Sequence, residues 1–350
     1  MSESDLEAVL DALFLPLTNG AIDMPATGAC VFLRARAGIW LQRWSDMACV
    51  QTFKPFADAL IRAGASLDAP IAAQAGGLVL VLPPRQRDEA RALLAQAVRQ
   101  AGHGGVVVAC QPNNAGARSG ETDLARLAGA VQSLSKHKCR VYWSRIDESR
   151  VDCAPLEEWI ALDAPRPIGG GRWQSRPGLF AWDRVDAASA LLVEHLPADL
   201  RGRVADLGAG YGYLAAEVVR RCAAVDAIDL YEAEQRAEEC ARSNLAEACR
   251  DAGRDVAFAF CWHDVTRGLA GRYDAIVSNP PFHQGRADQP ELGRAFIEVA
   301  ADALQPHGAL WLVANRHLAY EATLAARFAA VRVVDVRDGF KVIEAREPRA

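Results

Sequence analysis

A buried strand breaks into closely spaced glycines at residues 204–212, Val-Ala-Asp-Leu-Gly-Ala-Gly-Tyr-Gly, which limits the chain to few folds. Glycine adopts positive φ without strain and lets a ligand approach the backbone. A helix is expected directly afterwards, over about Tyr213 to Cys222. Strand, glycine turn and helix in this order predict an open α/β sheet with a ligand at the carboxyl end of the strand. The candidate ligand-binding residues in the turn are Asp206, Gly208 and Gly210.

Two later apolar runs also end close to an acidic residue. A strand over Val225 to Ile228 is expected to end in Asp229, whose carboxylate would accept hydrogen bonds from two ribose hydroxyls. A third strand, over Val256 to Trp262, is followed by Asp264, which would accept from the amino group of an adenine. A helix-cap or turn role explains Asp264 equally well.

The strand expected over Tyr273 to Ser278 ends in Asn-Pro-Pro-Phe. Asn279 offers a side-chain carbonyl, and Pro280 offers a backbone carbonyl on a residue of fixed φ. Two such acceptors can hold the amino protons of a flat ring while an aromatic side chain stacks on it. A plain strand end followed by a turn is the alternative, because Pro-Pro is common in loops. The candidate catalytic residues are Asn279, Pro280, Pro281 and Phe282.

The order of these signals says more than any one of them. A glycine turn, a ribose acid, an adenine acid and then an Asn-Pro-Pro-Phe strand predict a site for S-adenosylmethionine. The chemistry expected there is methyl transfer to an exocyclic nitrogen of a base, for which the protein orients the nitrogen and the cofactor supplies the electrophile.

Length and composition fit a two-domain enzyme of the cytoplasm. A chain of 350 residues is long enough for two cores. It has no apolar stretch of membrane-spanning length, and its acidic N-terminus is unlike a signal peptide. The nine cysteines form no C-x-x-C pair, which argues against zinc ribbons and disulfide frameworks. Cys261 and His263 lack two further close ligands, so no metal is expected.

The formal net charge of −5 is unusual for a nucleic-acid enzyme, so any basic footprint must be local. Only four of the 39 basic residues are lysines. Arginine suits phosphate contacts and base stacking, but a GC-rich genome explains the same bias. The best candidate footprint interleaves arginines with aromatic residues between the two halves of the chain: Arg166, Arg172, Trp173, Arg176, Phe180, Trp182 and Arg184.

The chain also repeats itself weakly. Residues 77–84 and 274–281 are both apolar strands that end in Pro-Pro. Each is followed by an expected helix, Asp88 to Gln100 or Leu292 to Leu304, and then by another strand. A duplicated α/β domain explains this, and chance similarity is the alternative. Because Leu82 replaces the amide of Asn279 and no glycine turn precedes it, the first copy is expected to be inactive.

Residues 163–178, rich in Pro, Gly and Arg, predict a linker. A helix to about Leu196 follows, for which Asp183 and Asp186 are candidate caps; the alternative is a lid over the cofactor, favoured for Phe180. Near the end, strands joined by Asp-Gly at 338–339 predict a hairpin. The expected fold is two tandem Rossmann-like methyltransferase domains, the second with a seven-stranded sheet that ends in this antiparallel hairpin.

The chain resembles the ribosomal RNA small subunit methyltransferase C family, with the large-subunit enzymes as near neighbours. The resemblance is close over 155–346 and looser before, where Tyr142 and residues 116–120 also fit. Trp182, Arg184 and the polar helix after Asp229 depart from the family pattern. The matching motifs are Pro-Gly-Leu-Phe at 177–180 with Asp183 and Asp186, Asp-Leu-Gly-Ala-Gly at 206–210, Ser-Asn-Pro-Pro-Phe-His-Gln-Gly at 278–285, Val-Ala-Asn at 313–315 and Phe-Lys-Val at 340–342.

The resemblance implies methylation of the exocyclic 2-amino group of a guanosine in 16S rRNA, within the small ribosomal subunit. It implies an inactive methyltransferase-like domain over 1–160, a linker and lid over 161–185 and a catalytic domain over 186–350. A monomer is expected, since a fused duplicate already supplies a partner surface. The alternatives are the same reaction on 23S rRNA, methylation of adenine N6 or of a protein glutamine, and a non-enzymatic RNA-binding factor.

Overall fold

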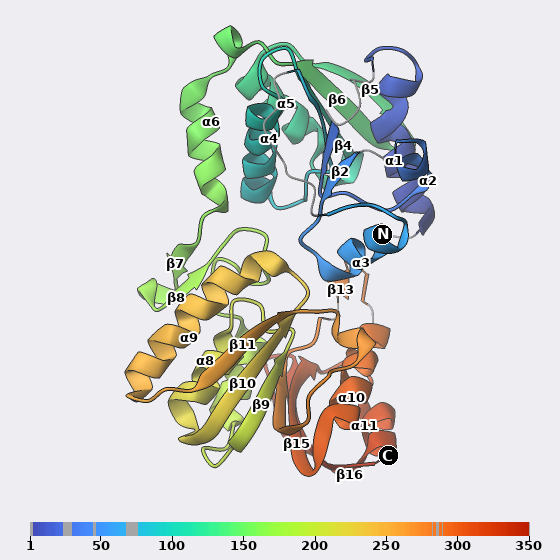
Figure 1. The fold of residues 1–350 in the computed structure, drawn as a ribbon. Coiled ribbons are helices and arrows are strands. Elements are labelled where there is room, and N and C mark those ends of the chain that lie inside the picture. The colour runs from blue at the N-terminus through green and yellow to red at the C-terminus, as the bar shows by residue number, and fades with distance from the viewer. Residues whose placement is uncertain are drawn as a thin grey trace. The chain divides into compact units, whose positions relative to one another are not determined.

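A computed structural model describes residues 3–23, 30–44, 47–67, 76–281, 283–284, 287–288 and 290–349. The chain divides into two compact units, Met1–Ala164 and Pro165–Ala350 (Figure 1). Each unit is built on its own mixed sheet flanked by helices, which confirms the expected fold class. Within the described ranges, no helix is long and apolar enough to cross a membrane.

The first unit contains a six-stranded sheet in the order β2-β1-β3-β4-β6-β5. Its first four strands are parallel, and β5 and β6 form an antiparallel hairpin beside β4. One face packs on α1, α2 and α3, and the other on α4, α5 and α6. The strands are β1 (Cys30–Leu33), β2 (Ala48–Val50), β3 (Leu78–Val81), β4 (Val106–Pro112), β5 (Gln132–Lys136) and β6 (Cys139–Arg145), and the helices are α1 (Glu3–Thr18), α2 (Ile39–Arg43), α3 (Lys54–Arg62), α4 (Arg87–Ala101), α5 (Ala117–Ala128) and α6 (Cys153–Ile160).

The second unit contains a seven-stranded sheet in the order β11-β10-β9-β12-β15-β17-β16. The first five strands are parallel, and β17 runs antiparallel to both neighbours. Helices α7, α8 and α9 cover one face, and α10 and α11 the other. The strands are β9 (Arg201–Leu207), β10 (Ala224–Glu232), β11 (Ala257–Trp262), β12 (Tyr273–Ser278), β15 (Leu304–Asn315), β16 (Phe328–Arg337) and β17 (Phe340–Pro348), and the helices are α7 (Ala187–His195), α8 (Tyr213–Arg221), α9 (Glu238–Ala252), α10 (Pro290–Ala303) and α11 (Glu321–Arg327).

The expected C-terminal hairpin is confirmed by the pairing of β16 with β17. Its turn residues Asp338 and Gly339 have φ of 53° and 84°. A two-residue turn of this kind needs positive φ at both central positions, which Asp-Gly tolerates. The hairpin closes an otherwise parallel sheet, as predicted from the sequence.

The central strands of this sheet are buried on both faces, so they lack the alternation of a half-exposed strand. In β12, Val277 packs toward α7, α8 and α9, while Ile276 packs toward α10 and α11. The strands end together, because Ser278 of β12 and Tyr231 of β10 both lie in register with Leu207 of β9. The segments that follow these strands therefore meet at one edge of the sheet.

Two expected boundaries differ from the structure. The predicted end of the second strand at Ile228 is wrong, because β10 continues to Glu232 and pairs with β11 throughout 227–232. The segment expected to be a linker contains a two-stranded antiparallel sheet of β7 (Arg166–Ile168) and β8 (Trp173–Ser175). A second small pairing joins β13 (His283–Gln284) to β14 (Ala287–Asp288).

The two units share a strand order, which supports the duplication predicted from the sequence. The order β2-β1-β3-β4-β6-β5 matches β10-β9-β12-β15-β17-β16, and the second unit adds β11 at the edge. In the first unit the Pro-Pro pair at 83–84 follows β3, which lies beside β1. In the second unit the pair at 280–281 follows β12, which lies beside β9. A helix and then the next parallel strand come after it.

Candidate active site

The glycine turn and the Asn-Pro-Pro segment lie against each other. Ser278 Oγ donates a hydrogen bond of 2.7 Å to the carbonyl of Leu207, which joins the ends of β12 and β9. Gly208 has a φ of +76°, which L side chains rarely adopt, and a Cβ built on it would stand 3.8 Å from Pro281 Cδ. The same Cβ would lie 3.9 Å from the carbonyl oxygen of Asn279. The two motifs, about 70 residues apart in the chain, thus form one surface.

One small pocket of the second unit joins four segments of the chain. Residues 180–181, the start of α7, the glycine turn and the residue after β12 all contribute. Its lining residues are Phe180, Ala181, Asp186, Ser189, Gly208, Ala209, Gly210, Tyr211, Tyr213, Leu214 and Asn279. Of the residues predicted from the sequence, the structure brings Asn279, Gly208, Gly210 and Phe180 together here.

The side-chain amide of Asn279 is held by the first turn of α7. Its Nδ2 donates to Asp186 Oδ2 at 3.0 Å and to Ser189 Oγ at 2.9 Å. Asp186 is also the N-cap of α7, because the same oxygen accepts from the backbone N–H of Ser189 at 2.8 Å. The capping role expected of Asp186 is confirmed, and its bond to Asn279 was not foreseen from the sequence. Asp183 is exposed and pairs with Arg184 instead.

Asp206 lies beneath the glycine turn and is fully buried. Its Oδ2 accepts from the backbone N–H of Ala215 at 3.0 Å. Its Oδ1 is buried and has no hydrogen-bond partner among the described residues. Burial, with a smaller contribution from Glu232, raises the pKa of Asp206 from its ordinary 3.8 to about 7. This carboxyl group therefore has an unused oxygen close to the turn.

Asp229, predicted as the ribose acid, belongs to a different network. It lies opposite Ala205, before the strand ends. Its Oδ2 accepts from Arg203 Nη2 at 2.5 Å and from the hydroxyl of Tyr273 at 2.7 Å. Tyr273 in turn shares a hydrogen bond of 2.7 Å with the hydroxyl of Tyr231. Asp229 thus crosslinks β9, β10 and β12 and does not line the pocket.

Glu232 is the acidic residue at the end of β10, and the sequence analysis missed it. Its Oε2 accepts from the backbone N–H of Gly210 at 2.7 Å, and its Oε1 accepts from that of Glu234 at 2.8 Å. Burial raises the pKa of Glu232 despite these backbone hydrogen bonds. A usable signal was present, because Leu230 and Tyr231 continue the apolar run past Asp229.

Asp264 follows β11 and caps a short 3-10 turn, Val265–Arg267. Its Oδ1 accepts from the backbone N–H of Thr266 at 3.1 Å and from the hydroxyl of Thr266 at 2.7 Å. The capping alternative is thereby confirmed. Asp264 does not line the pocket, and its role toward an adenine stays a prediction.

The strand β8, which precedes Phe180, is bonded to α9 and to the glycine turn through the side-chain amide of Asn244. Asn244 Oδ1 accepts from the backbone N–H of Gln174 at 2.8 Å, and its Nδ2 donates to the carbonyl of Gln174 at 2.9 Å. The same Nδ2 donates to the carbonyl of Tyr211 in the glycine turn at 2.7 Å. Phe180, which follows, lines the pocket yet is 60% exposed. The segment that carries Phe180 therefore follows an anchored strand, and its role as a lid stays a prediction.

Three features of the predicted motif region lie outside the described residues. These are Phe282, Gly285 and the side chain of His283. The stacking role expected of Phe282 stays a prediction.

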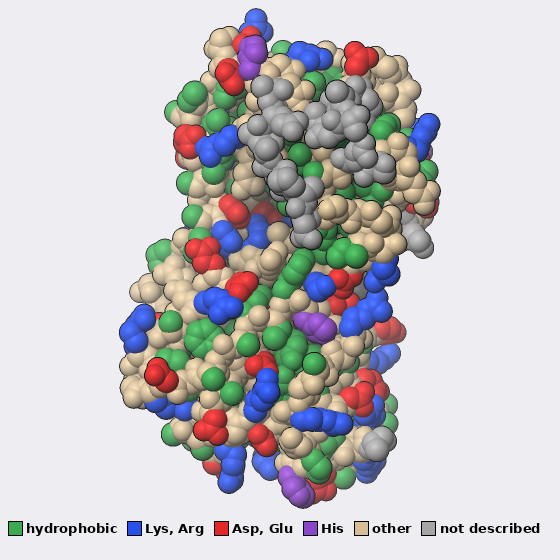
Figure 2. Space-filling view, in the orientation of Figure 1, with side chains coloured by type: hydrophobic (Ala, Val, Ile, Leu, Met, Phe, Trp, Pro, Cys, Tyr) green, Lys and Arg blue, Asp and Glu red, His purple; other side chains and the backbone are tan. Residues whose placement is uncertain are grey.

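The arginines expected to form a basic footprint have partners within their own unit. Arg172 pairs with Glu217 at 3.2 Å, and Arg184 pairs with Asp183 at 2.9 Å. On the face shown in Figure 2, basic and acidic side chains are interspersed. The described residues therefore present no broad field of positive charge on this face.

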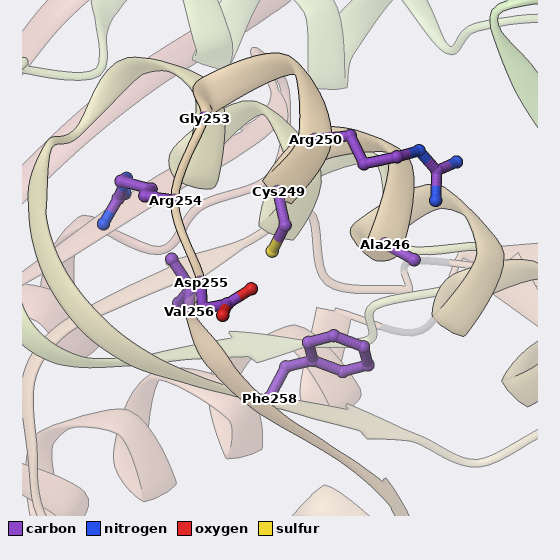
Figure 3. A pocket seen from close by; sticks show the side chains of 8 residues that line it. All are labelled: Ala246, Cys249, Arg250, Gly253, Arg254, Asp255, Val256 and Phe258. Atoms are coloured by element: carbon purple, nitrogen blue, oxygen red, sulfur yellow. The ribbon is translucent and has the colours of Figure 1, made fainter.

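A larger hollow of about 510 Å³ lies at the amino end of β11, the opposite end of the sheet from the glycine turn (Figure 3). Arg254 at its rim donates to the carbonyls of Val219, Cys222 and Val225. Arg250 pairs with Glu247. None of the predicted site residues lines this hollow, so the smaller pocket is the candidate active site.

Comparison with known proteins gives consistent relatives. The methyltransferase small domain family matches residues 171–344. A ribosomal RNA small subunit methyltransferase C from Pseudomonas paraeruginosa is 32% identical over 285 residues, which is 80% of this chain and 81% of the relative. The enzyme of that name from Pectobacterium atrosepticum is 30% identical over 311 residues, 87% of this chain and 83% of the relative.

Among solved structures, the T. thermophilus 16S rRNA N2 G1207 methyltransferase in complex with AdoMet and guanosine is similar over both units. The TM-score is 0.76 at 25% sequence identity, and the match covers 97% of this chain and 91% of the other. The identities to the curated relatives extend over four fifths or more of this chain. This chain therefore belongs to the ribosomal RNA small subunit methyltransferase C family.

Proposed function

We propose that this protein transfers a methyl group from S-adenosylmethionine to the exocyclic 2-amino group of a guanosine in 16S rRNA. The observation that carries the proposal is the pocket in which Asn279 and the glycine turn meet. An acceptor for amino protons and a backbone turn that admits a ligand are the two parts that such a transfer needs. The relatives' names and the guanosine in the T. thermophilus complex support the choice of base.

The residues around the turn fit the cofactor. When bound, S-adenosylmethionine would supply an electrophilic methyl group: a new N–C bond forms to the base nitrogen, the C–S bond breaks to leave a neutral thioether, and the nitrogen loses a proton to solvent. The positive φ of Gly208 and the open space beside Gly210 leave room against the backbone. When ionised, Asp206, whose Oδ1 is unused, and Glu232 would give this region a negative potential suited to a cation. We assign the ribose hydroxyls to Glu232 in place of Asp229.

Asn279 and Pro280 orient the target nitrogen. The side-chain oxygen of Asn279 and the backbone carbonyl of Pro280 accept the two amino protons, so the lone pair is turned toward the turn side of the pocket. The guanine must leave its stack, at a cost of a few kcal/mol. Stacking on Phe282 would return roughly 1–3 kcal/mol.

The first unit is proposed to be a methyltransferase-like domain without a cofactor site. Where Gly208 follows β9, Arg34 follows the corresponding strand β1, with a φ of 54° and an ion pair to Glu89 at 2.5 Å. The side chain of Arg34, paired with Glu89, therefore occupies the position at which Gly208 of the second unit has no side chain. Leu82, which replaces Asn279, cannot accept a hydrogen bond. This unit would brace the catalytic unit or hold RNA.

The proposed setting is the small ribosomal subunit in the cytoplasm, with the protein acting as a monomer. The formal net charge of −5 gives the protein little general attraction to phosphates. Recognition of the shape of a folded ribosomal particle is therefore favoured over binding to free RNA. Ribosomal RNA as substrate implies the compartment in which ribosomes are built.

Tritium transfer from labelled cofactor tests the proposal. Purified protein is incubated with small subunits, large subunits and naked 16S rRNA, and the labelled nucleoside is identified by chromatography. Label in 2-methylguanosine of the small subunit is expected. Label confined to the large subunit, to adenosine or to protein would replace the proposed substrate, and absence of label in every arm would refute methyl transfer.

A further inference from the structure

We infer that Asp186 and Ser189 are positioning residues for methyl transfer: they fix which end of the Asn279 amide faces the target base and strengthen its oxygen as an acceptor. The inference rests on the proposed function, because it concerns the same amide. It goes beyond that function in assigning a role to the first turn of α7, 90 or more residues earlier in the chain.

The orientation follows from the chemistry of a carboxylate. An ionised Asp186 can only accept hydrogen bonds. It stands 3.0 Å from the Asn279 amide, so a flipped amide would set oxygen against oxygen. The carboxylate therefore selects the rotamer in which Nδ2 faces α7 and Oδ1 is left for a ligand. Ser189 accepts the second N–H at 2.9 Å, so both donors of the amide are used.

The two residues that hold the Asn279 amide, Asp186 and Ser189, are themselves fixed by the start of α7. Asp186 Oδ2 accepts from the backbone N–H of Ser189 as well as from Asn279, so the helix cap and the amide clamp share one oxygen. Ser189 is only 7% exposed, and both residues line the pocket with Asn279. A group anchored to a helix backbone keeps its geometry better than one on a free side chain.

The charge adds to the orientation. A hydrogen bond from an amide N–H to a carboxylate polarises the amide and increases the negative charge on its oxygen. During the transfer, positive charge moves from the sulfonium to the amino nitrogen whose protons that oxygen accepts. A negative charge fixed behind Asn279 stabilises this nitrogen more as the positive charge develops than it does in the neutral base.

Three variants separate the parts of this arrangement. Ser189→Ala removes one acceptor and leaves the backbone N–H, and thus the cap, in place. Ser189→Thr keeps the hydroxyl. Asp186→Asn keeps an oxygen for capping, since Asn and Asp cap equally well, but removes the charge. Ser149→Ala is the control, because the backbone N–H of Ser149 donates to the cap residue Asp147 in the first unit as that of Ser189 donates to Asp186, while the Ser149 hydroxyl donates to Asp147 and takes no part in the pocket.

Turnover should fall by about fivefold in Ser189→Ala and by about ten- to hundredfold in Asp186→Asn, following the strengths of neutral and charged hydrogen bonds. Ser189→Thr should recover most of the loss, and Ser149→Ala should match the wild type. The KM for RNA and the calorimetric Kd for cofactor should change by no more than about twofold. Unchanged turnover in both Ser189→Ala and Asp186→Asn, or equal losses in turnover and cofactor affinity, would overturn the inference.

A readout without catalysis separates this inference from the proposed function. In protein labelled with ¹⁵N-asparagine, the Asn279 side-chain signal is identified by its loss in Asn279→Ala. Its amide protons should exchange slowly with water in the wild type and faster in Ser189→Ala and Asp186→Asn, with no change in Ser149→Ala. Equal exchange rates in all of these proteins would show that Asp186 and Ser189 do not hold the Asn279 amide, even if methylation is found. Slow exchange in the wild type without any methylation would refute only the proposed function.

Discussion

Glu232 Oε2 accepts a hydrogen bond of 2.7 Å from the backbone N–H of Gly210. The acidic residue that ends β10 thus contacts the glycine turn directly. Asp229 instead pairs with Arg203 and Tyr273, inside the sheet. These two carboxylates should therefore respond differently to substitution.

Glu232→Gln should weaken cofactor binding by about ten- to hundredfold, since hydrogen bonds to a charged group contribute about 1.5–3 kcal/mol. Asp229→Asn should change the Kd by less than about threefold and should lower the thermal midpoint instead. Isothermal calorimetry with S-adenosylmethionine and a thermal melt of each variant provide both values. A normal Kd in Glu232→Gln together with a large loss in Asp229→Asn would return the ribose role to Asp229.

Asn279→Ala should reduce turnover by at least about a hundredfold, a typical loss when a preorganised polar contact to the reacting group is removed. Cofactor binding should survive, because the alanine leaves the glycine turn and Glu232 unchanged. Single-turnover methylation and calorimetry on the same preparation measure the two quantities. Full activity would exclude Asn279 from the chemistry.

Cofactor binding should tighten as the pH rises through about 7. Burial raises the pKa of Asp206 to about 7, so in the free protein this carboxyl is largely protonated below that value. A cationic ligand favours the ionised form, so binding below pH 7 releases a proton, and affinity grows with pH until the carboxyl is ionised without ligand.

Calorimetry at pH 6 and pH 8, in buffers of different ionisation enthalpy, measures both the Kd and the protons released. Asp206→Asn keeps an oxygen for the backbone N–H of Ala215 and should flatten the profile. An identical pH dependence in wild type and Asp206→Asn would assign the titration to another group.

Tyr273→Phe should lower the free energy of unfolding by about 1–3 kcal/mol. The hydroxyl is fully buried and bonds to both Asp229 and Tyr231, whose buried polar groups would each lose a partner. Denaturant titration followed by circular dichroism gives the change. A stability equal to that of the wild type would indicate that water replaces the lost hydroxyl.

The fold was predictable because its signals are local. The glycine turn, the apolar β12 and the Asp-Gly hairpin each specify their backbone within a few residues. The end of β10 was misplaced because an acid at 229 resembled a strand end, although Leu230 and Tyr231 continue the apolar run. The small β7–β8 pairing was hidden in a segment whose Pro and Gly content is typical of loops.

The candidate site was only partly predictable, because its contacts join distant segments. Asn279 and the glycine turn were found from their own residue types. The bond from Asn279 to Asp186 spans 93 residues and depends on how α7 packs against the end of β12, which no local pattern encodes. The capping of Asp264, by contrast, was one of two local alternatives, and geometry decided between them.

The central claim is tested most directly by nucleoside mass spectrometry of rRNA from cells that lack the gene, complemented with either the wild type or Asn279→Ala. The account predicts that one 2-methylguanosine disappears from 16S rRNA, returns with the wild type and stays absent with Asn279→Ala. A complete set of 2-methylguanosines in 16S rRNA without the gene would contradict it.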